Sequence, residues 1–391
     1  MDFKMKDELG IYIHIPFCKQ KCYYCDFISF SKKEEEVQEY IECLKKEIIA
    51  NREPAKDYKI STIYIGGGTP SYIDSSKIVS IIETIYKNYD VEEDAEITIE
   101  INPGTVNKEK LKDYKKAGIN RISIGLQSTN NDILKTIGRI HTYEQFLDTY
   151  KLARSLGFSN INVDLMLALP NQTEDILEDS LQKIINLNPE HISLYSLILE
   201  EDTKLCELVE DKKVELPNEE TERKMYWQTK NILQQNGYMH YEISNFAKEG
   251  KCSKHNLNCW NQKQYIGFGI SAHSYFGKTR YSNTQDLKQY IQYWAGTVGA
   301  GLVSAHTTTQ TIHETQTLQD EQKEYMLLGL RKIQGISIKE FKTKFIQNPI
   351  YIFRKELDKL VTEELIEIDI DNIKLTDKGL DFANQVWEEF V

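Results

Sequence analysis

The sequence predicts an α/β protein, a partial (β/α)6 barrel of the TIM type followed by an α+β carboxyl-terminal extension that resembles a winged helix. Two observations predict this class. From residue 11 to about residue 200, β-branched runs alternate with stretches of helical periodicity, which is the pattern of βα units around a parallel sheet. After about residue 205 the alternation stops. We expect three domains: a core barrel at 1–205, an extension at 206–315 and a winged-helix-like domain at 316–391.

Six β-branched runs supply the candidate strands of the barrel. They are residues 11–15, 61–67, 96–102, 121–127, 161–167 and 191–197. The segments between them, such as 36–49 and 75–89, carry apolar residues at helical spacing. Six βα units suggest an open, partial barrel. Because a parallel barrel collects function on the loops at the carboxyl ends of its strands, the residues that follow each run are the candidates for function.

The rest of the chain predicts different elements. We expect a helix at about 218–236, a polar and aromatic loop region at 238–284, and then another helix. From about residue 318 the expected order is three helices, the hairpin 365–375 and a final helix. In an acidic protein such a terminal unit is expected to serve as structural packing or as a lid rather than to bind DNA.

Composition excludes several classes of protein. The formal net charge of -12 argues against a broad nucleic-acid-binding face, because phosphate backbones are bound by clustered Lys and Arg. The opening MDFKMKDELG has no apolar signal core, and no run of about 18 apolar residues occurs. We therefore expect a cytoplasmic protein with no nucleic-acid partner and at most peripheral contact with a membrane.

Three of the seven cysteines crowd into one short segment as Cys18-x3-Cys22-x2-Cys25. Four irons held by three nearby thiolates leave one iron of a 4Fe-4S cluster open, and S-adenosylmethionine (SAM) can chelate that iron. The alternative is a structural zinc site, which usually needs four Cys or His ligands. The other thiols are expected to be buried or idle: Cys43, Cys206, Cys252 and Cys259.

The cysteine triplet after the first strand resembles the radical SAM superfamily. The glycine motif of that superfamily is matched by Gly66 to Pro70, directly after the second strand. Glycine lets backbone approach a ligand closely, so its amides and carbonyls can hold the methionyl ammonium. His14 either faces the cluster loop or is a hydrogen-bonded histidine of the barrel interior.

Further motifs are similar to the oxygen-independent coproporphyrinogen III oxidase family over nearly the whole chain. They are HIPFC (14–18), GGGTP (66–70), ExNP (100–103), GLQS (125–128), GRxH (138–141) and DLMLALP (164–170). This resemblance implies roles in SAM binding for Tyr12, Tyr24, Gly67, Gly68, Thr69, Glu100, Gln127, Arg139 and Asp164, with Ile198 as a weaker candidate.

The chemistry of these side chains suits the implied roles. Carboxylates such as Glu100 and Asp164 suit ribose hydroxyls or an ammonium, and Arg139 suits the methionyl carboxylate. The ring of Tyr24 can flank the adenine. Each has an ordinary alternative, because a carboxylate at the end of a strand can cap a helix and an arginine can form a surface ion pair. No catalytic residue is assigned.

Two positions distinguish the branches of this family. Coproporphyrinogen-oxidising members carry a further Cys two positions after the third, and here Phe27 occupies that position. The segment 255–260, HNLNCW, and the nearby segment 265–276 resemble the heme chaperone branch instead, although Cys259 stands where that branch has Tyr. His255 is the candidate heme ligand, and Cys259 is an alternative. Trp260 offers a flat face to a porphyrin or anchors the loop.

Two functions follow from the resemblance. The first is a heme chaperone that binds a 4Fe-4S cluster, SAM and heme and hands the heme to an acceptor protein. The second is a radical SAM enzyme acting on a porphyrin, by oxidative decarboxylation or methyl transfer. Phe27 and the segment 255–260 favour the first, so coproporphyrinogen oxidase activity is not expected. An electron donor such as a flavodoxin or ferredoxin is implied as a further partner.

Overall fold

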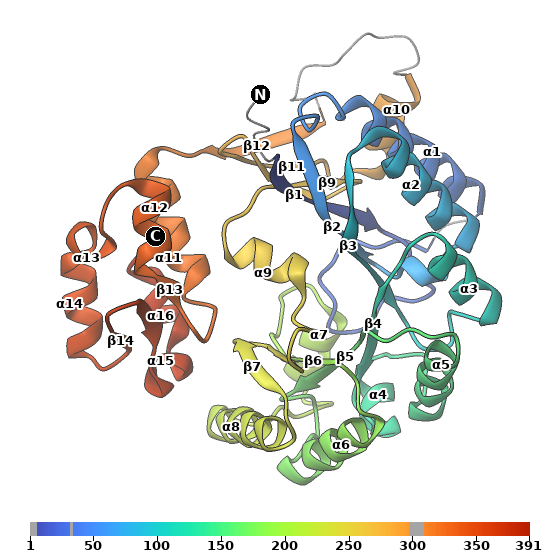
Figure 1. Ribbon diagram of the computed structural model, residues 1–391. Coiled ribbons are helices and arrows are strands. Elements are labelled where there is room, and N and C mark those ends of the chain that lie inside the picture. Colours follow the sequence, from blue (N-terminus) through green and yellow to red (C-terminus); the bar gives the residue numbers. More distant parts are fainter. Residues whose placement is uncertain (1–5, 32–33, 297–308) are drawn as a thin grey trace.

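The computed structural model describes residues 6–31, 34–296 and 309–391 (Figure 1). Residues 1–5 lie outside the described residues, and the expected absence of an export signal rests partly on them. Parts of the predicted barrel and of the predicted extension also lie outside the described residues. Within the described ranges, the helices are too short or too polar to cross a membrane.

Six parallel strands form the centre of the molecule, and they lie side by side in chain order. They are β1 (Asp7–Ile15), β2 (Tyr58–Gly67), β3 (Val91–Ile101), β4 (Arg121–Gln127), β5 (Ile161–Leu167) and β6 (His191–Ser196). The curved sheet is covered on the outside by α1 (Glu34–Ala50), α2 (Ser75–Asn88), α3 (Lys108–Lys116), α4 (Asn131–Thr136), α5 (Tyr143–Ser155) and α6 (Glu174–Leu187) (Figure 1). The prediction of a partial barrel of six βα units is confirmed.

The two faces of this sheet differ in chemistry. Successive side chains of a strand point to opposite faces. One set, which includes Ile63, Ile97 and Ile122, is aliphatic, fully buried and part of the main hydrophobic core. The alternate positions are polar, as at Thr62, and they place hydrogen-bonding groups inside the barrel. The barrel interior is therefore suited to holding polar groups in position.

The segment after residue 205 extends this sheet at both ends. It begins with α7 (Lys204–Glu210) and α8 (Glu219–Gln235), and its strands are β7 (Met239–Glu242), β8 (Asn245–Ala247), β9 (Tyr265–Phe268), β10 (His273–Phe276), β11 (Thr279–Asn283) and β12 (Gln310–Thr315). The order of the sheet is β12-β11-β10-β9-β1-β2-β3-β4-β5-β6-β8-β7. The prediction of a loop region at 238–284 is wrong, because the region contains strands β7 to β11. The sequence did not reveal these strands because they are too short to show a β-branched run.

Two helices interrupt these strands. Helix α10 (Leu287–Gly296) packs against α1, and the expected helix after the loop region is confirmed. Helix α9 (Lys254–Trp260) contacts β2 and lies in the middle of the ring of strands (Figure 1). The HNLNCW segment is therefore a helix inside the barrel and not part of a loop.

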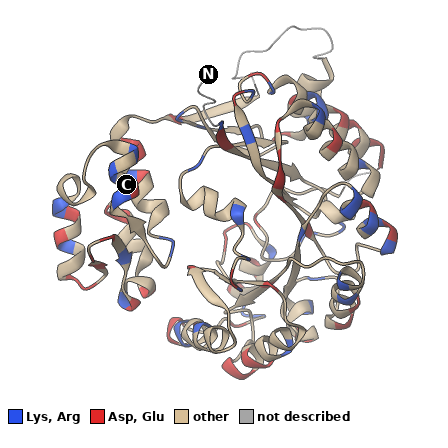
Figure 2. Ribbon diagram, viewed as in Figure 1, with Lys and Arg blue, Asp and Glu red and all other residues tan. Residues whose placement is uncertain are grey.

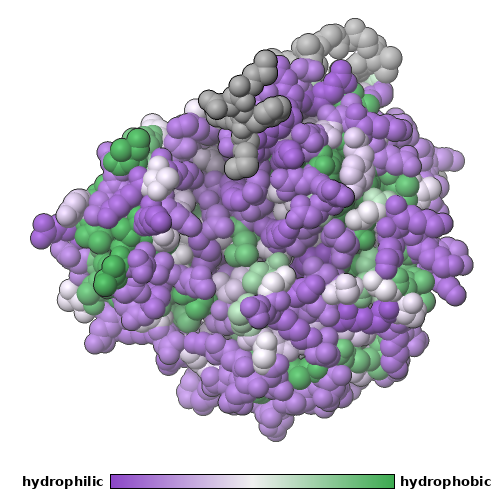
Figure 3. Space-filling model, in the orientation of Figure 1, coloured by the Kyte–Doolittle hydropathy of each residue, from purple (hydrophilic) through white to green (hydrophobic). Residues whose placement is uncertain are grey.

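The carboxyl-terminal domain has its own hydrophobic core, in which Met326, Phe341 and Val386 are fully buried. Its elements are α11 (Leu318–Gly329), β13 (Ile336–Ser337), α12 (Ile338–Phe345), α13 (Pro349–Ile352), α14 (Arg354–Thr362), β14 (Ile366–Ile368), β15 (Asn372–Leu375), α15 (Asp377–Asp381) and α16 (Ala383–Glu388). The hairpin lies between helices as expected, but α13 and α14 are separate short helices and so are α15 and α16, so four helices precede the hairpin and two follow it where three and one were expected. The likeness to a winged helix stays a prediction. Figure 3 shows a mostly hydrophilic surface, with hydrophobic atoms gathered over this domain.

Arg331, just after α11, joins this domain to the barrel. Its guanidinium lies 4.4 Å from the ring centroid of Trp260 and 4.9 Å from that of Trp387. Its carbonyl oxygen accepts a hydrogen bond from the backbone N–H of Ile243 at 3.1 Å. The side chain thus links the last residue of α9 to the last helix of the chain.

We expect Arg331→Ala to lower the free energy of unfolding by about 2 kcal/mol, because two cation–π contacts and their packing are lost. The measurement is a urea titration followed by circular dichroism. The control is Arg354→Ala, since the side chain of Arg354 is 78 % exposed and forms an ion pair with its helix neighbour Asp358. Equal midpoints for the two variants would contradict this prediction.

Candidate functional site

A cavity of about 550 Å³ opens at the carboxyl ends of the barrel strands. Every residue that the sequence assigned to the cluster or to SAM lines it, except Tyr12. These lining residues are Cys18, Cys22, Cys25, Tyr24, Gly67, Gly68, Thr69, Glu100, Gln127, Arg139, Asp164 and Ile198. They come from loops far apart in the chain, and the parallel barrel brings them to one edge.

The cysteine loop follows β1, and its three thiols are free and partly exposed. The Sγ atom of Cys18 lies 3.4 Å from the Oγ1 atom of Thr69, and Nη1 of Arg139 donates to Sγ of Cys22 at 3.5 Å. Burial raises the pKa of Cys25 to about 11 and also raises the pKa of Cys18. Binding of iron by these thiols therefore releases protons. Among the described residues, no group of three or more His, Cys, Asp or Glu side chains is positioned to hold a metal ion as it stands.

The glycine segment after β2 packs directly against the cysteine loop. A Cβ atom on Gly68 would lie 3.0 Å from Sγ of Cys18 and 3.0 Å from the backbone of Phe17. Gly67 has a φ of +111°, a conformation that side chains disfavour. The backbone N–H of Gly68 donates to the carbonyl of Ile15 at 2.9 Å. Glycine is needed here because the segment packs closely against the cysteine loop, and the predicted close approach to a ligand stays a prediction.

Two carboxyl groups from neighbouring parts of the barrel face the cavity. Glu100, near the end of β3, accepts a hydrogen bond from the Tyr64 hydroxyl at 2.8 Å, and burial raises its pKa to about 7. Asp164, on β5, accepts from Ser123 Oγ at 3.0 Å and from Asn162 Nδ2 at 2.7 Å. Burial raises the pKa of Asp164 as well. Neither carboxyl group caps a helix.

Arg139 reaches the cavity from the loop after α4. Its Nη2 atom donates to Asn102 Oδ1 at 2.8 Å and also to the carbonyl of Gly125. Its Nε atom is buried and has no hydrogen-bond partner among the residues that the structure describes. Arg139 is therefore not a surface pairing residue, and its guanidinium retains a donor for a ligand. The three free thiols suit a cluster. The unpaired donor of Arg139 and the closely packed glycine segment suit an anionic group of SAM.

The exposed residues of the cavity lining include apolar side chains as well as charged ones such as Lys21 and Asp26. Phe27 is 62 % exposed and Ile198 is 68 % exposed, and both line the cavity. The sequence did not assign Tyr64, Asn102, Ser123 or Tyr195, which also line it. For Tyr64 and Ser123 a signal existed, because strand alternation places their side chains on the same face as Glu100 and Asp164.

Three histidine and tyrosine candidates lie outside this cavity. The Tyr12 hydroxyl lies 3.0 Å from Nδ1 of His14, and its ring stacks on Tyr64 at 6.3 Å. His14 is buried, and its Nε2 atom lies 3.5 Å from the carbonyl oxygen of Ile28 in the cysteine loop, so both of its expected roles stay open. His255 is buried with its Nδ1 atom 2.9 Å from Oγ1 of Thr62, and burial lowers its pKa to about 4.

Cys259 and Trp260, the other two residues of the HNLNCW segment that were considered as heme contacts, are partly exposed. Burial raises the pKa of Cys259 to about 11, so its thiol is protonated at neutral pH. The ring of Trp260 is covered by the guanidinium of Arg331, as described above. In this conformation Trp260 anchors the carboxyl-terminal domain.

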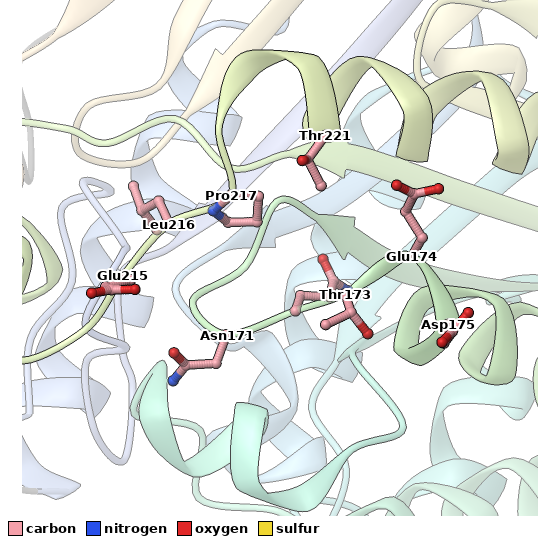
Figure 4. A pocket seen from close by; sticks show the side chains of 9 residues that line it. Asn171, Thr173, Glu174, Asp175, Glu215, Leu216, Pro217 and Thr221 are labelled. Carbon is pink, nitrogen blue, oxygen red and sulfur yellow. The ribbon is translucent and has the colours of Figure 1, made fainter.

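A second hollow, of about 580 Å³, lies between the loop before α6 and the segment before α8 (Figure 4). Glu174, Asp175 and Glu215 line it together with uncharged groups. Its lining includes none of the residues expected to bind the cluster, SAM or heme. On the outer helices of the molecule, acidic and basic residues are interspersed (Figure 2).

Comparison with known proteins gives consistent matches. The radical SAM superfamily model matches residues 12–184, and the HemN C-terminal domain model matches residues 316–382. The chain is 37 % identical to heme chaperone HemW of Bacillus subtilis over 381 residues, which is 97 % of this chain and 98 % of that protein. It is 36 % identical to heme chaperone HemW of Lactococcus lactis over 380 residues, which is 97 % and 96 % of the two chains.

A solved structure of coproporphyrinogen III oxidase from Escherichia coli, a radical SAM enzyme, has a similar fold. The TM-score is 0.83 at 22 % sequence identity, over 98 % of this chain and 90 % of that one. At this identity the likeness concerns the fold alone.

Proposed function

Because the chain belongs to the radical SAM superfamily and, within it, to the HemW heme chaperone family, we propose that it binds a 4Fe-4S cluster, SAM and heme and transfers heme to an acceptor protein. The observation that carries this proposal is the single cavity in which three free cysteines meet the glycine segment, two carboxyl groups and Arg139. An α/β barrel commonly binds its ligands at this edge.

Cys18, Cys22 and Cys25 would hold three irons of a 4Fe-4S cluster, and such a cluster would supply SAM with an open iron and an electron. The backbone of Gly67, Gly68 and Thr69 and the guanidinium of Arg139 hold the methionyl group.

The remaining residues contact the nucleoside or the methionyl ammonium of SAM. Glu100 and Asp164 accept hydrogen bonds from ribose hydroxyls or from the ammonium, and Tyr24 flanks the adenine. Gln127 and Ile198 line the rest of the SAM site. Tyr12 acts through Tyr64, on which it stacks. The core barrel at 1–205, the extension at 206–315 and the terminal domain at 316–391 remain our proposed division.

Heme is the cargo of the protein and not a substrate for oxidation. Phe27 replaces the additional cysteine of the oxidising branch, and the relatives that match over nearly the full chain are named heme chaperones. His255 is the proposed ligand of heme iron. Since its imidazole is buried and bonded to Thr62, heme ligation by His255 requires α9 to move. The proposed partners are an acceptor protein and an electron donor such as a flavodoxin or ferredoxin, in the cytoplasm.

Anaerobically reconstituted protein is expected to bind about one heme per chain, because one ligand residue is proposed. It is also expected to leave coproporphyrinogen III unchanged in the presence of SAM and an electron donor. Titration of heme absorbance measures the first result and porphyrin fluorescence the second. Escherichia coli coproporphyrinogen III oxidase is the positive control. Formation of protoporphyrinogen IX by this protein would overturn the assignment.

A further inference from the structure

We infer that His191 and Tyr241 are positioning residues for SAM, which hold the carboxylate of Asp164 through a chain of hydrogen bonds that begins at helix α9. Neither residue lines the cavity. The inference rests on the proposed role of Asp164 as a SAM contact. It adds two residues that act through Asp164, and it gives α9 a function in the SAM site.

The chain of hydrogen bonds is continuous over five residues. The backbone N–H of Ser253 donates to the Tyr241 hydroxyl at 3.3 Å. That hydroxyl lies 2.7 Å from Nε2 of His191, and Nδ1 of His191 lies 2.6 Å from Oδ1 of Asn162. Nδ2 of Asn162 donates to Oδ1 of Asp164 at 2.7 Å. Ser253 is the N-cap residue of α9, so the chain connects this helix to the cavity.

These bonds fix one direction of donation. Oδ1 of Asn162 is an acceptor only, so Nδ1 of His191 must carry the proton. Burial lowers the pKa of His191 well below its usual value, so the ring is neutral and Nε2 accepts from the Tyr241 hydroxyl. Each donor therefore points toward Asp164. Hydrogen bonds in such a chain polarise one another, and here the polarisation favours the carboxylate form.

Helix α9 is also connected to Glu100, indirectly, through contacts with β3 and with Tyr64. The carboxylate of Glu96 accepts from the backbone N–H groups of Lys254 and His255, both at 3.1 Å. The His255 ring lies 5.2 Å from the ring of Tyr64, whose hydroxyl donates to Glu100. Both carboxyl groups of the cavity thus depend on the position of α9.

Asp164 has charged and titratable neighbours on four other strands of the barrel. Glu100 on β3, Tyr64 on β2 and Tyr195 on β6 lie close enough to interact with its charge, and so does the buried cation Arg121 on β4. Arg121 forms no ion pair within 4.0 Å in the described part of the chain. The hydrogen bonds that stabilise the Asp164 carboxylate come from Ser123, from Ser193 and from Asn162, the last donor in the chain of hydrogen bonds that begins at α9.

The test measures the dissociation constant of SAM by equilibrium dialysis on the reconstituted holoprotein. Tyr241→Phe removes one hydroxyl and should weaken SAM binding about five-fold, the effect of one lost hydrogen bond. The pH below which SAM binding is lost should also rise, because the Asp164 carboxylate is less stabilised. The matched control is Tyr238→Phe, which removes a buried hydroxyl bonded to the Pro189 carbonyl at 2.9 Å and should change neither quantity.

A second pair of variants tests the same chain if Tyr241→Phe unfolds. The amide of His191→Gln can both donate to Asn162 and accept from Tyr241, whereas His191→Leu can do neither. We expect the Gln variant to retain more SAM affinity than the Leu variant. The electron paramagnetic resonance spectrum of the reduced cluster with SAM should change in the same order. Equal losses in the two variants would overturn the inference.

Asp164→Asn separates the two proposals. If SAM binding is unchanged in Asp164→Asn, the proposed role of Asp164 fails. If Asp164→Asn weakens SAM binding while Tyr241→Phe matches Tyr238→Phe in both affinity and pH dependence, the positioning chain fails and the proposed site stands.

Discussion

Cys22→Ala is expected to lose essentially all of its 4Fe-4S cluster, which is the largest effect of any substitution considered. Three thiolates are the smallest set that holds a cube with one open iron, so the loss of one leaves two irons without protein ligands. Cys22 also accepts a hydrogen bond from Arg139 at 3.5 Å, so its substitution removes a contact between the cluster and the SAM site. The measurement is the iron and sulfide content together with the visible absorbance after anaerobic reconstitution.

Cys252→Ala is the matched control, because Cys252 is a partly exposed thiol that does not line the cavity. It should retain the full cluster. Thermal unfolding of both apoproteins by circular dichroism should give equal midpoints. A full 4Fe-4S complement in Cys22→Ala would contradict the ligand assignment, and stoichiometric zinc in anaerobically purified wild-type protein would favour the zinc alternative.

The second large effect is expected for Glu100→Gln. In the wild-type protein, SAM binding should weaken about tenfold per pH unit below pH 7, because burial raises the pKa of Glu100 to about 7 and only the carboxylate interacts strongly with SAM. The sign follows from linkage: SAM favours the ionised form, so binding below pH 7 must release a proton. In Glu100→Gln the affinity should fall more than about tenfold at pH 8, and this part of the pH dependence should vanish.

Glu47→Gln is the control for a buried carboxyl group away from the cavity. Burial also raises the pKa of Glu47 to about 7, and its carboxylate accepts from Gly269 N–H at 2.8 Å and from the Tyr290 hydroxyl at 2.6 Å. SAM affinity and its pH dependence should be those of the wild-type protein in this variant, provided that its melting curve shows it folded. If the pH dependence of SAM affinity in Glu100→Gln were that of the wild-type protein, a group other than Glu100 would be responsible for it.

Much of the site could be predicted from the sequence because its signals are local. The spacing of Cys18, Cys22 and Cys25 lies within one loop, and Gly67 and Gly68 directly follow a recognisable strand. The strand runs predicted from β-branched residues agree with β1 to β6. Because parallel strands bring their carboxyl ends to one edge, residues that follow different runs were expected to meet.

Other features could not be predicted because they depend on partners remote in the chain. The strands from β7 to β12 are short and pair at the sheet edges, where the partner and not the run of residues determines the conformation. Tyr12 was placed on the SAM site by resemblance, but it lies behind Tyr64. No local signal indicated that Arg331 stacks on Trp260.

The sequence by itself determined the parallel barrel and the cluster loop, since periodicity and spacing act over a few residues, whereas the polar residues proposed to bind SAM were implied by the resemblance to the coproporphyrinogen III oxidase family. Only the tertiary structure decided that α9 lies inside the barrel, that His255 is buried against Thr62, and that Ser253 is connected to Asp164 through Tyr241, His191 and Asn162. Those contacts join residues separated by up to about two hundred positions. They form because a buried polar group must find its hydrogen-bond partner wherever packing places one.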